Sequence, residues 1–120
     1  MNNNTKPTGI KKLWSASIYS AQGLKACYKS EYAFRLEAWL ALVLVPLGYW
    51  LGESDIERVL LIAPIFLVLI VEMINSAIEA LVDRVSLEKH ELSGFAKDVA
   101  SAAVLLSLVI FLIVWAIILL

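Results

Sequence analysis

Glu72 is the residue whose chemistry contrasts most with its sequence neighbours. It directly follows thirteen apolar residues, Val59–Val71. Lipid cannot solvate a carboxylate, so an ionisable group at the edge of a membrane span indicates binding, proton transfer or metal chemistry. Helical residues three, four and seven positions apart share one face. On that face lie Glu72, Asn75, Ser76, Glu79 and Asp83. This polar stripe is expected to run from lipid into water, with a lipid headgroup at its buried end and a soluble anion or metal ion at its wet end.

Simpler roles for the polar stripe stay open. Glu79 and Asp83 alone fit a solvated continuation of the helix. Glu72 and Asn75 fit an interhelical hydrogen bond that stabilises an oligomer by about 1 kcal/mol. His90 is a poor metal ligand by itself, because the sequence lacks the Cys and His partners expected of a zinc site.

Familiar phosphate-binding motifs are absent from the sequence. There is no GxxxxGK[ST], no glycine-rich kinase loop, no GxGxxG, and no GxSxG elbow of a serine hydrolase. The remaining groups are carboxylates, which hold Mg²⁺, and lysines, which neutralise phosphate. Any nucleotide chemistry would therefore rest on these side chains, and no nucleic-acid partner is expected.

The composition indicates an integral membrane protein. The chain has 120 residues, of which 61% are hydrophobic, and a mean hydropathy of +0.81. A hydrocarbon core of about 30 Å needs roughly 20 helical residues. Three segments are long enough, at 32–52, 57–82 and 99–120. We predict an all-α membrane protein with three transmembrane helices in a single domain, 1–120.

A further helix is predicted ahead of the spans, over residues 9–30. Apolar side chains recur there at helical spacing, at Ile10, Leu13, Trp14, Ile18, Ala21, Leu24 and Tyr28. An amphipathic helix of this kind lies in the membrane surface, with its lysines facing anionic groups. Packing of the same apolar stripe against the protein's own spans remains an alternative.

The distribution of Lys and Arg predicts the orientation in the membrane. Six of the ten lie within the first 35 positions, whereas only Arg58 lies near the loop between the first two spans. The loop expected over residues 83–98 contains three more. Because loops rich in Lys and Arg stay in the cytoplasm, the amino terminus and the 83–98 loop are predicted to be cytoplasmic, with Leu120 on the far side.

Three segments together resemble the bacterial integral-membrane diacylglycerol kinase family: EYAFRLE (31–37), EMINSAIEALVDR (72–84) and HELSGFAKD (90–98). The resemblance extends over most of the chain and includes its length and its short acidic first loop. It implies a homotrimer in the bacterial inner membrane, with a periplasmic carboxyl terminus and active sites shared between subunits. The implied reaction is the ATP-dependent phosphorylation of diacylglycerol to phosphatidic acid, with Mg²⁺ as cofactor.

Carried over by position, the resemblance implies roles for individual residues. Glu72 would be the catalytic base on the lipid hydroxyl, Glu31 and Glu79 would bind Mg²⁺, and Asn75 would support the site. The implied nucleotide contacts are Lys12, Tyr19, Glu31, Glu79, Glu88, Lys89, His90, Lys97 and Asp98. The implied lipid contacts are Lys12, Ala16, Ser17, Ile18, Tyr19, Ser20, Ala21, Lys25, Ala26, Cys27, Tyr28, Ala33, Phe34, Arg35, Leu36, Glu37, Trp50, Arg58, Glu72, Val99 and Ser101.

Other functions compete with this interpretation. The same fold and site would serve a polyprenol such as undecaprenol, because the chemistry needs only a hydroxyl at the interface. Alternatively, Glu72 and Glu79 would form a proton or cation relay in a small transport subunit, although three spans are few for alternating access. A purely structural subunit would leave the polar stripe and the 86–98 segment without a shared purpose. ATP-dependent incorporation of phosphate into lipid would distinguish a kinase from the transport subunit and from the structural subunit.

Overall fold

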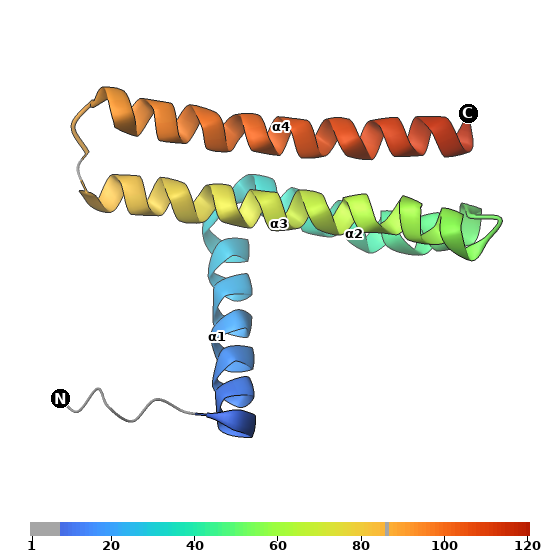
Figure 1. Cartoon of the computed structure of the whole chain (residues 1–120), viewed down its shortest axis with the longest axis horizontal. Helices are drawn as coiled ribbons and strands as arrows, with labels where there is room; N and C mark the ends of the chain where they lie inside the picture. The colour runs from blue at the N-terminus through green and yellow to red at the C-terminus, as the bar shows by residue number, and fades with distance from the viewer. Residues whose placement is uncertain (1–7, 86) are drawn as a thin grey trace.

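The chain folds into four helices in a computed structural model that describes residues 8–85 and 87–120 (Figure 1). The helices are α1 Gly9–Ser30, α2 Tyr32–Leu51, α3 Asp55–Val85 and α4 Glu91–Leu119. Helices α2, α3 and α4 are each long and apolar enough to cross a membrane. The predicted all-α fold with three candidate membrane spans is therefore confirmed. Residues 1–7 and Ser86, which belong to the predicted domain, lie outside the described residues.

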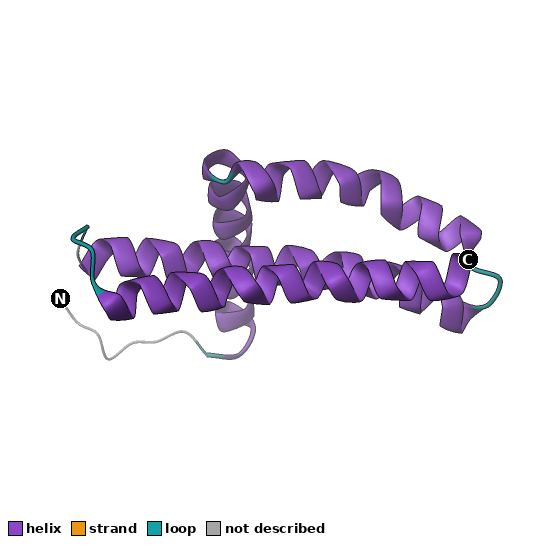
Figure 2. Cartoon of the chain, turned by 90° about the horizontal axis from the view of Figure 1, so that it is seen from above, coloured by secondary structure: helices purple, strands orange, loops and turns teal. Residues whose placement is uncertain are grey.

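Helix α3 is the centre of the bundle, because α2 and α4 both pack against it (Figures 1 and 2). Its buried residues follow the helical repeat, at Leu61, Pro64, Ile65, Val68 and Glu72. Leu61 is completely buried, and only 7% of Glu72 is exposed. Spacing of this kind places one stripe of a helix against its neighbours. Glu72 therefore continues the core stripe of α3.

A glycine lets the three long helices approach one another. A Cβ atom at Gly48 of α2 would lie 3.3 Å from Leu61 Cβ and 3.4 Å from Trp115 Cζ2. Trp115 Nε1 of α4 donates a hydrogen bond to the Leu61 carbonyl of α3 at 2.9 Å. A larger side chain at position 48 would separate these helices, so Gly48 contributes to the alignment of α2 with α3.

A single residue, Glu31, separates α1 from α2. Arg35 Nη1 donates to the carbonyls of Tyr28 and Lys29 at 2.8 and 3.0 Å. These carbonyls belong to the last turn of α1, where helix carbonyls lack partners within the helix. Trp39 Nε1 donates to the Tyr28 hydroxyl at 2.9 Å. The contacts hold α1 across the direction of the long helices, and α3 and α4 extend past it (Figure 1).

Helix α4 begins earlier than the predicted third span. Residues 91–98, expected in a loop over 83–98, form its first two turns, and α3 continues to Val85. His90 caps α4, because its Nδ1 accepts a hydrogen bond from the Leu92 backbone N–H at 3.1 Å. An N-cap satisfies a backbone donor that the first turn leaves unpaired. The expectation of a long loop was therefore wrong, and the connection between α3 and α4 is short.

Helix α4 turns most of its apolar side chains outward. Ala100 and Ser107 are its only buried residues. An apolar surface of this size requires lipid or protein against it. Helix α4 is therefore suited to contact a bilayer or a neighbouring copy of the chain.

Candidate active site

Glu72 faces a second carboxyl group inside the bundle. The carboxyl of Glu37 on α2 lies within hydrogen-bonding reach of it. Glu37 Oε2 and Glu72 Oε2 are both buried, and neither finds a hydrogen-bond donor among the described residues. Buried polar atoms are nearly always paired, so an exception points to a functional site. Glu72 Oε2 is therefore an acceptor held out of water and without a donor among the described residues.

The end of α1 lies near Glu72. Cys27 lies beside Glu31, Glu72 and the Ser76 hydroxyl. Burial is the main cause that raises the pKa of the Cys27 thiol; a hydrogen bond with Ser76 opposes the increase, and the two carboxylates add to it. A raised pKa keeps the thiol protonated at neutral pH, so Cys27 is an uncharged neighbour and not a nucleophile. The structure thus brings Glu31 and Glu72 of the predicted site together.

Glu79 lies two helical turns beyond Glu72 and is half-buried. Its Oε1 accepts a hydrogen bond from Asn75 Nδ2 at 3.1 Å, so Asn75 orients this carboxylate. Glu31 and Glu79 both lie within electrostatic range of Glu72. No three His, Cys, Asp or Glu side chains of the described chain gather into a metal site by themselves. Mg²⁺ is usually held by one or two carboxylates together with substrate phosphates, so Glu31 and Glu79 supply the type of ligand that it prefers.

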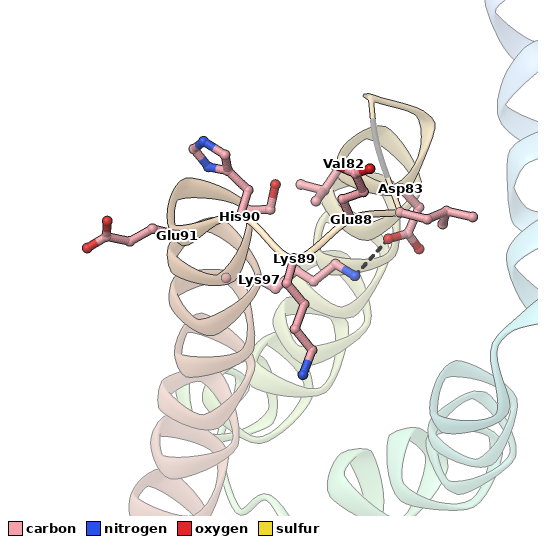
Figure 3. Close-up of a pocket in the computed structure, with 10 residues that line it drawn as sticks. Val82, Asp83, Glu88, Lys89, His90, Glu91 and Lys97 are labelled. Atoms are coloured by element: carbon pink, nitrogen blue, oxygen red, sulfur yellow. Dashed lines mark hydrogen bonds and ion pairs between the residues drawn. The ribbon is translucent and has the colours of Figure 1, made fainter.

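A polar cleft lies where α3 ends and α4 begins, a region we call the α3–α4 junction (residues 82–97; Figure 3). The cleft has a volume of about 470 Å³, within the range of small-molecule sites. Lys97 Nζ donates to Asp83 Oδ1 at 2.7 Å and so joins the two helices. The lining residues are Val82, Asp83, Leu87, Glu88, Lys89, His90, Glu91, Ser93, Gly94 and Lys97. Four of the predicted nucleotide contacts, at positions 88, 89, 90 and 97, therefore surround one opening.

The remaining predicted nucleotide contacts lie elsewhere. Lys12 and Tyr19 are exposed on α1, and Asp98 is exposed on α4 without lining the cleft. His90 does line the cleft, but its ring points away from Lys97 and Asp83 in Figure 3, and its Nδ1 caps α4. Within one chain, the cleft is thus built by the α3–α4 junction without α1.

The predicted lipid contacts are dispersed over the molecule. Those on α1, within 12–28, are exposed or half-buried, and those on α4, at positions 99 and 101, are exposed. Phe34 packs in the core with 5% of its surface exposed. Arg58 lies near the start of α3, about 21 Å from Glu72 along the helix axis, and Trp50 lies near the end of α2. One chain does not gather these residues into a single lipid site.

Asp83 is the functional candidate that the sequence left without a role. It belongs to the polar stripe, whose spacing is the only signal in the sequence for it. Its contact with Lys97 joins residues fourteen positions apart, and no pattern in the sequence pairs them. Leu87, Ser93 and Gly94 also line the cleft, and their residue types give no warning of it.

Comparison with known proteins identifies the family. A profile of prokaryotic diacylglycerol kinase matches residues 18–119. The chain belongs to the prokaryotic diacylglycerol kinase family. The diacylglycerol kinase of Escherichia coli strain K12 is 50% identical over 119 residues, which cover 99% of this chain and 96% of that protein. The diacylglycerol kinase of Haemophilus influenzae is 50% identical over 110 residues, or 92% of this chain and 93% of the relative. That of Pseudomonas aeruginosa is 50% identical over 113 residues, or 94% and 92%.

Membership in the diacylglycerol kinase family confirms the resemblance seen in the sequence and makes the chain an enzyme. Its three long apolar helices fit a multi-pass membrane protein. Polar groups stand out at two places in the structure: the buried carboxylate of Glu72 and the cleft beside Asp83. The unbroken helix α3 connects them, over about 16 Å of its axis.

Proposed function

We propose that this protein transfers the γ-phosphoryl group of ATP to the free hydroxyl of diacylglycerol and so produces phosphatidic acid. Relatives that share half of its residues carry the name diacylglycerol kinase. The observation that carries the proposal is Glu72 Oε2, a buried acceptor without a donor among the described residues, at the end of an apolar core stripe. A lipid hydroxyl arriving from the bilayer would supply a donor to it.

Glu72 acts as the general base in this proposal. Its Oε2 accepts the proton while the lipid hydroxyl oxygen bonds to the γ-phosphorus. The bond from that phosphorus to the β,γ-bridging oxygen breaks, and ADP leaves. Phosphoryl transfer depends mainly on in-line positioning and on the neutralisation of developing charge. Packing that fixes Glu72 beside Glu37 contributes the positioning.

Glu31 and Glu79 would hold the magnesium ion that accompanies ATP. When bound, Mg²⁺ neutralises charge that develops on the phosphoryl oxygens. Asn75 fixes one oxygen of Glu79 and thereby the direction of the other. The backbone of two helices meets at Glu31 and sets its position.

The cleft at the α3–α4 junction would take the nucleotide, with Lys89 and Lys97 facing its phosphates. We assign α1 to the cytoplasmic surface of the inner membrane as an amphipathic helix, with Lys12 and Tyr19 as further contacts. Helices α3 and α4 extend past α1 in Figure 1. In this arrangement the cleft stands in the cytoplasm while Glu72 stays at the lipid boundary.

The proposed assembly is a homotrimer with active sites shared between subunits. The outward apolar face of α4 supports a neighbouring copy. A shared site would also bring the α1 contacts of one copy to the cleft of another, which one chain alone does not do.

The test is transfer of labelled γ-phosphate from Mg²⁺-ATP to diacylglycerol or undecaprenol in mixed micelles. Glu72→Gln should lower the turnover of diacylglycerol by about 10²- to 10⁴-fold, the usual contribution of a general base. Glu53→Gln is the matched control, because Glu53 is exposed in the turn before α3, and it should keep the native rate. If only undecaprenol is labelled, the proposed site stands but the substrate is a polyprenol and not diacylglycerol. Equal rates for the Glu72→Gln variant and native protein would exclude Glu72 as the base.

Glu79→Gln tests the magnesium site separately. The neutral amide is a weaker ligand for a hard cation than a carboxylate. Half-maximal activity should therefore need more Mg²⁺, by about tenfold if the ligand contributes 1.4 kcal/mol. A Mg²⁺ titration of the initial rate measures this shift, and an unchanged midpoint would remove Glu79 from the metal site.

A further inference from the structure

Lys97 donates a hydrogen bond to Asp83, its hydrogen-bond partner among the described residues. Both side chains line the cleft (Figure 3). The exposed fractions are 42% for the Lys97 side chain and 48% for that of Asp83, so solvent and ligands reach the pair. A lysine ammonium has three N–H donors. Asp83 occupies one and leaves two for a ligand. Lys97, the residue that would contact phosphate, is therefore positioned by the carboxylate of Asp83.

The charges around Lys97 discriminate between ligands. A polyphosphate that contacts Lys97 also approaches the Asp83 carboxylate, which lies 2.7 Å from the same ammonium. Like charges at such separations repel even where solvent weakens the interaction. Glu79 lies one turn before Asp83 on the polar stripe, and Glu88 also lines the cleft. A metal ion bound to the polyphosphate offsets this repulsion, whereas a metal-free polyphosphate meets it in full.

We propose that Asp83 makes the enzyme select the magnesium complex of a nucleoside triphosphate over the metal-free nucleotide, an inference that rests on the proposed role of the cleft as the nucleotide site. Asp83 holds Lys97 at the α3–α4 junction, and Lys97 contacts the phosphates with its remaining donors. The carboxylate of Asp83 repels a triphosphate whose charge no metal ion has reduced. Asp83 is thus a specificity-determining residue that acts through Lys97 and the charge of the cleft.

Equilibrium binding of a non-hydrolysable ATP analogue tests the proposal in the full-length protein in detergent micelles. The dissociation constant is measured twice, in excess Mg²⁺ and in EDTA, for native protein and Asp83→Asn. The amide keeps an acceptor for Lys97 and removes the negative charge. The metal-free analogue should bind the variant about tenfold more tightly than native protein, as removal of one nearby like charge predicts. Binding of the magnesium complex should change less than twofold.

Two further variants make the result specific to charge at position 83. Asp83→Glu keeps the charge and should keep the native preference; loss of the preference in this variant would show that charge at position 83 does not set it. Asp55→Asn removes the acid of the ion pair with Arg58 at the far end of α3 and should leave both constants unchanged.

Each alternative result overturns the proposal in a different way. Equal tightening of both ligands by Asp83→Asn would make Asp83 a plain competitor for Lys97. Weaker binding of both would make it a structural support, and unchanged constants would leave it without a role. If native protein binds neither ligand form, the nucleotide cleft itself is wrong, while the lipid phosphorylation assay with Glu72→Gln still decides the proposed base.

Discussion

Two cations near opposite ends of α3 use their charge in different ways. Arg58 Nε donates to the Tyr49 carbonyl at 3.0 Å, its Nη1 pairs with Asp55 Oδ1 at 3.1 Å, and its guanidinium lies 4.8 Å from the centre of the Tyr49 ring. Lys97 makes a hydrogen bond and ion pair with Asp83 and with no other described residue. Three contacts therefore tie Arg58 to the fold, whereas a single contact holds Lys97.

The surroundings of the two cations differ as well: more contacts are made around Arg58 than around Lys97. At the α2–α3 junction, residues 48–58, Ser54 Oγ accepts from the Glu57 backbone N–H at 3.2 Å and caps α3. A Cβ atom at Gly52 would lie 2.7 Å from Arg58 Cγ and 2.9 Å from its backbone nitrogen. The α3–α4 junction instead encloses a cleft of about 470 Å³. A hollow of about 360 Å³ also lies at the α2–α3 junction, but Val59, Ile62 and Ala63 form half of its lining. Polar side chains form most of the lining at the α3–α4 junction, which makes that opening the better suited of the two to bind a charged ligand.

The comparison predicts its largest effect at Lys97. Lys97→Met keeps the apolar stem and removes the charge that would face phosphate. Loss of one preorganised electrostatic contact should lower phosphoryl transfer by about 10²- to 10³-fold. The free energy of unfolding should fall by less than about 1 kcal/mol, because an exposed ion pair contributes little. Initial rates over a range of ATP concentrations and unfolding by denaturant in micelles measure the two quantities.

Arg58→Met is the counterpart that can break the comparison. It removes two hydrogen-bonded contacts and a ring contact at once, so it should destabilise the protein more than Lys97→Met does. If Lys97→Met proves the more destabilising of the two, Lys97 serves the fold and the contrast between the junctions is wrong.

Gly52→Ala is expected to have the next largest effect, on stability. The new Cβ would contact the Arg58 backbone, which cannot move without disturbing the first turn of α3. Overpacking of this kind costs about 1–3 kcal/mol. Gly23→Ala is the control, since a Cβ there meets nothing within 4 Å and alanine favours a helix interior by about 1 kcal/mol. Unfolding by denaturant should separate the variants, and equal stability would show that the α2–α3 junction is looser than its contacts indicate.

The sequence predicted the long helices because apolar runs of membrane length leave little choice of structure. It did not predict where α4 begins. Residues 91–98 are polar and resembled a loop, and their helix depends on the cap made by His90 and on the contact of Lys97 with Asp83. The turn between α3 and α4 determines which residues form these contacts, so the sequence alone does not show the pairing.

The candidate site also has one part that the sequence predicted and one part that it did not. Glu72 was predictable because a carboxylate after an apolar run is costly in lipid. Its position opposite Glu37 was not, because the register of α2 on α3 depends on the elbow at Glu31 and on the close approach at Gly48. Spacing along one helix is therefore readable from the sequence, while contacts between helices require the packing of both.

Arg58→Lys should have the smallest effect and separates geometry from charge. Lysine keeps the positive charge but not the planar fork that reaches the Tyr49 carbonyl and Asp55 together while lying over the ring. The expected loss of unfolding free energy is about 0.5–1 kcal/mol, the contribution of an exposed cation–π contact. Lys97→Arg, the reverse exchange at the α3–α4 junction, should leave the free energy of unfolding unchanged, because Lys97 makes one contact that arginine can also make. An equal loss in both exchanges would mean that both sites depend on the shape of their cation, since charge is preserved in each, and would remove the contrast between the two junctions.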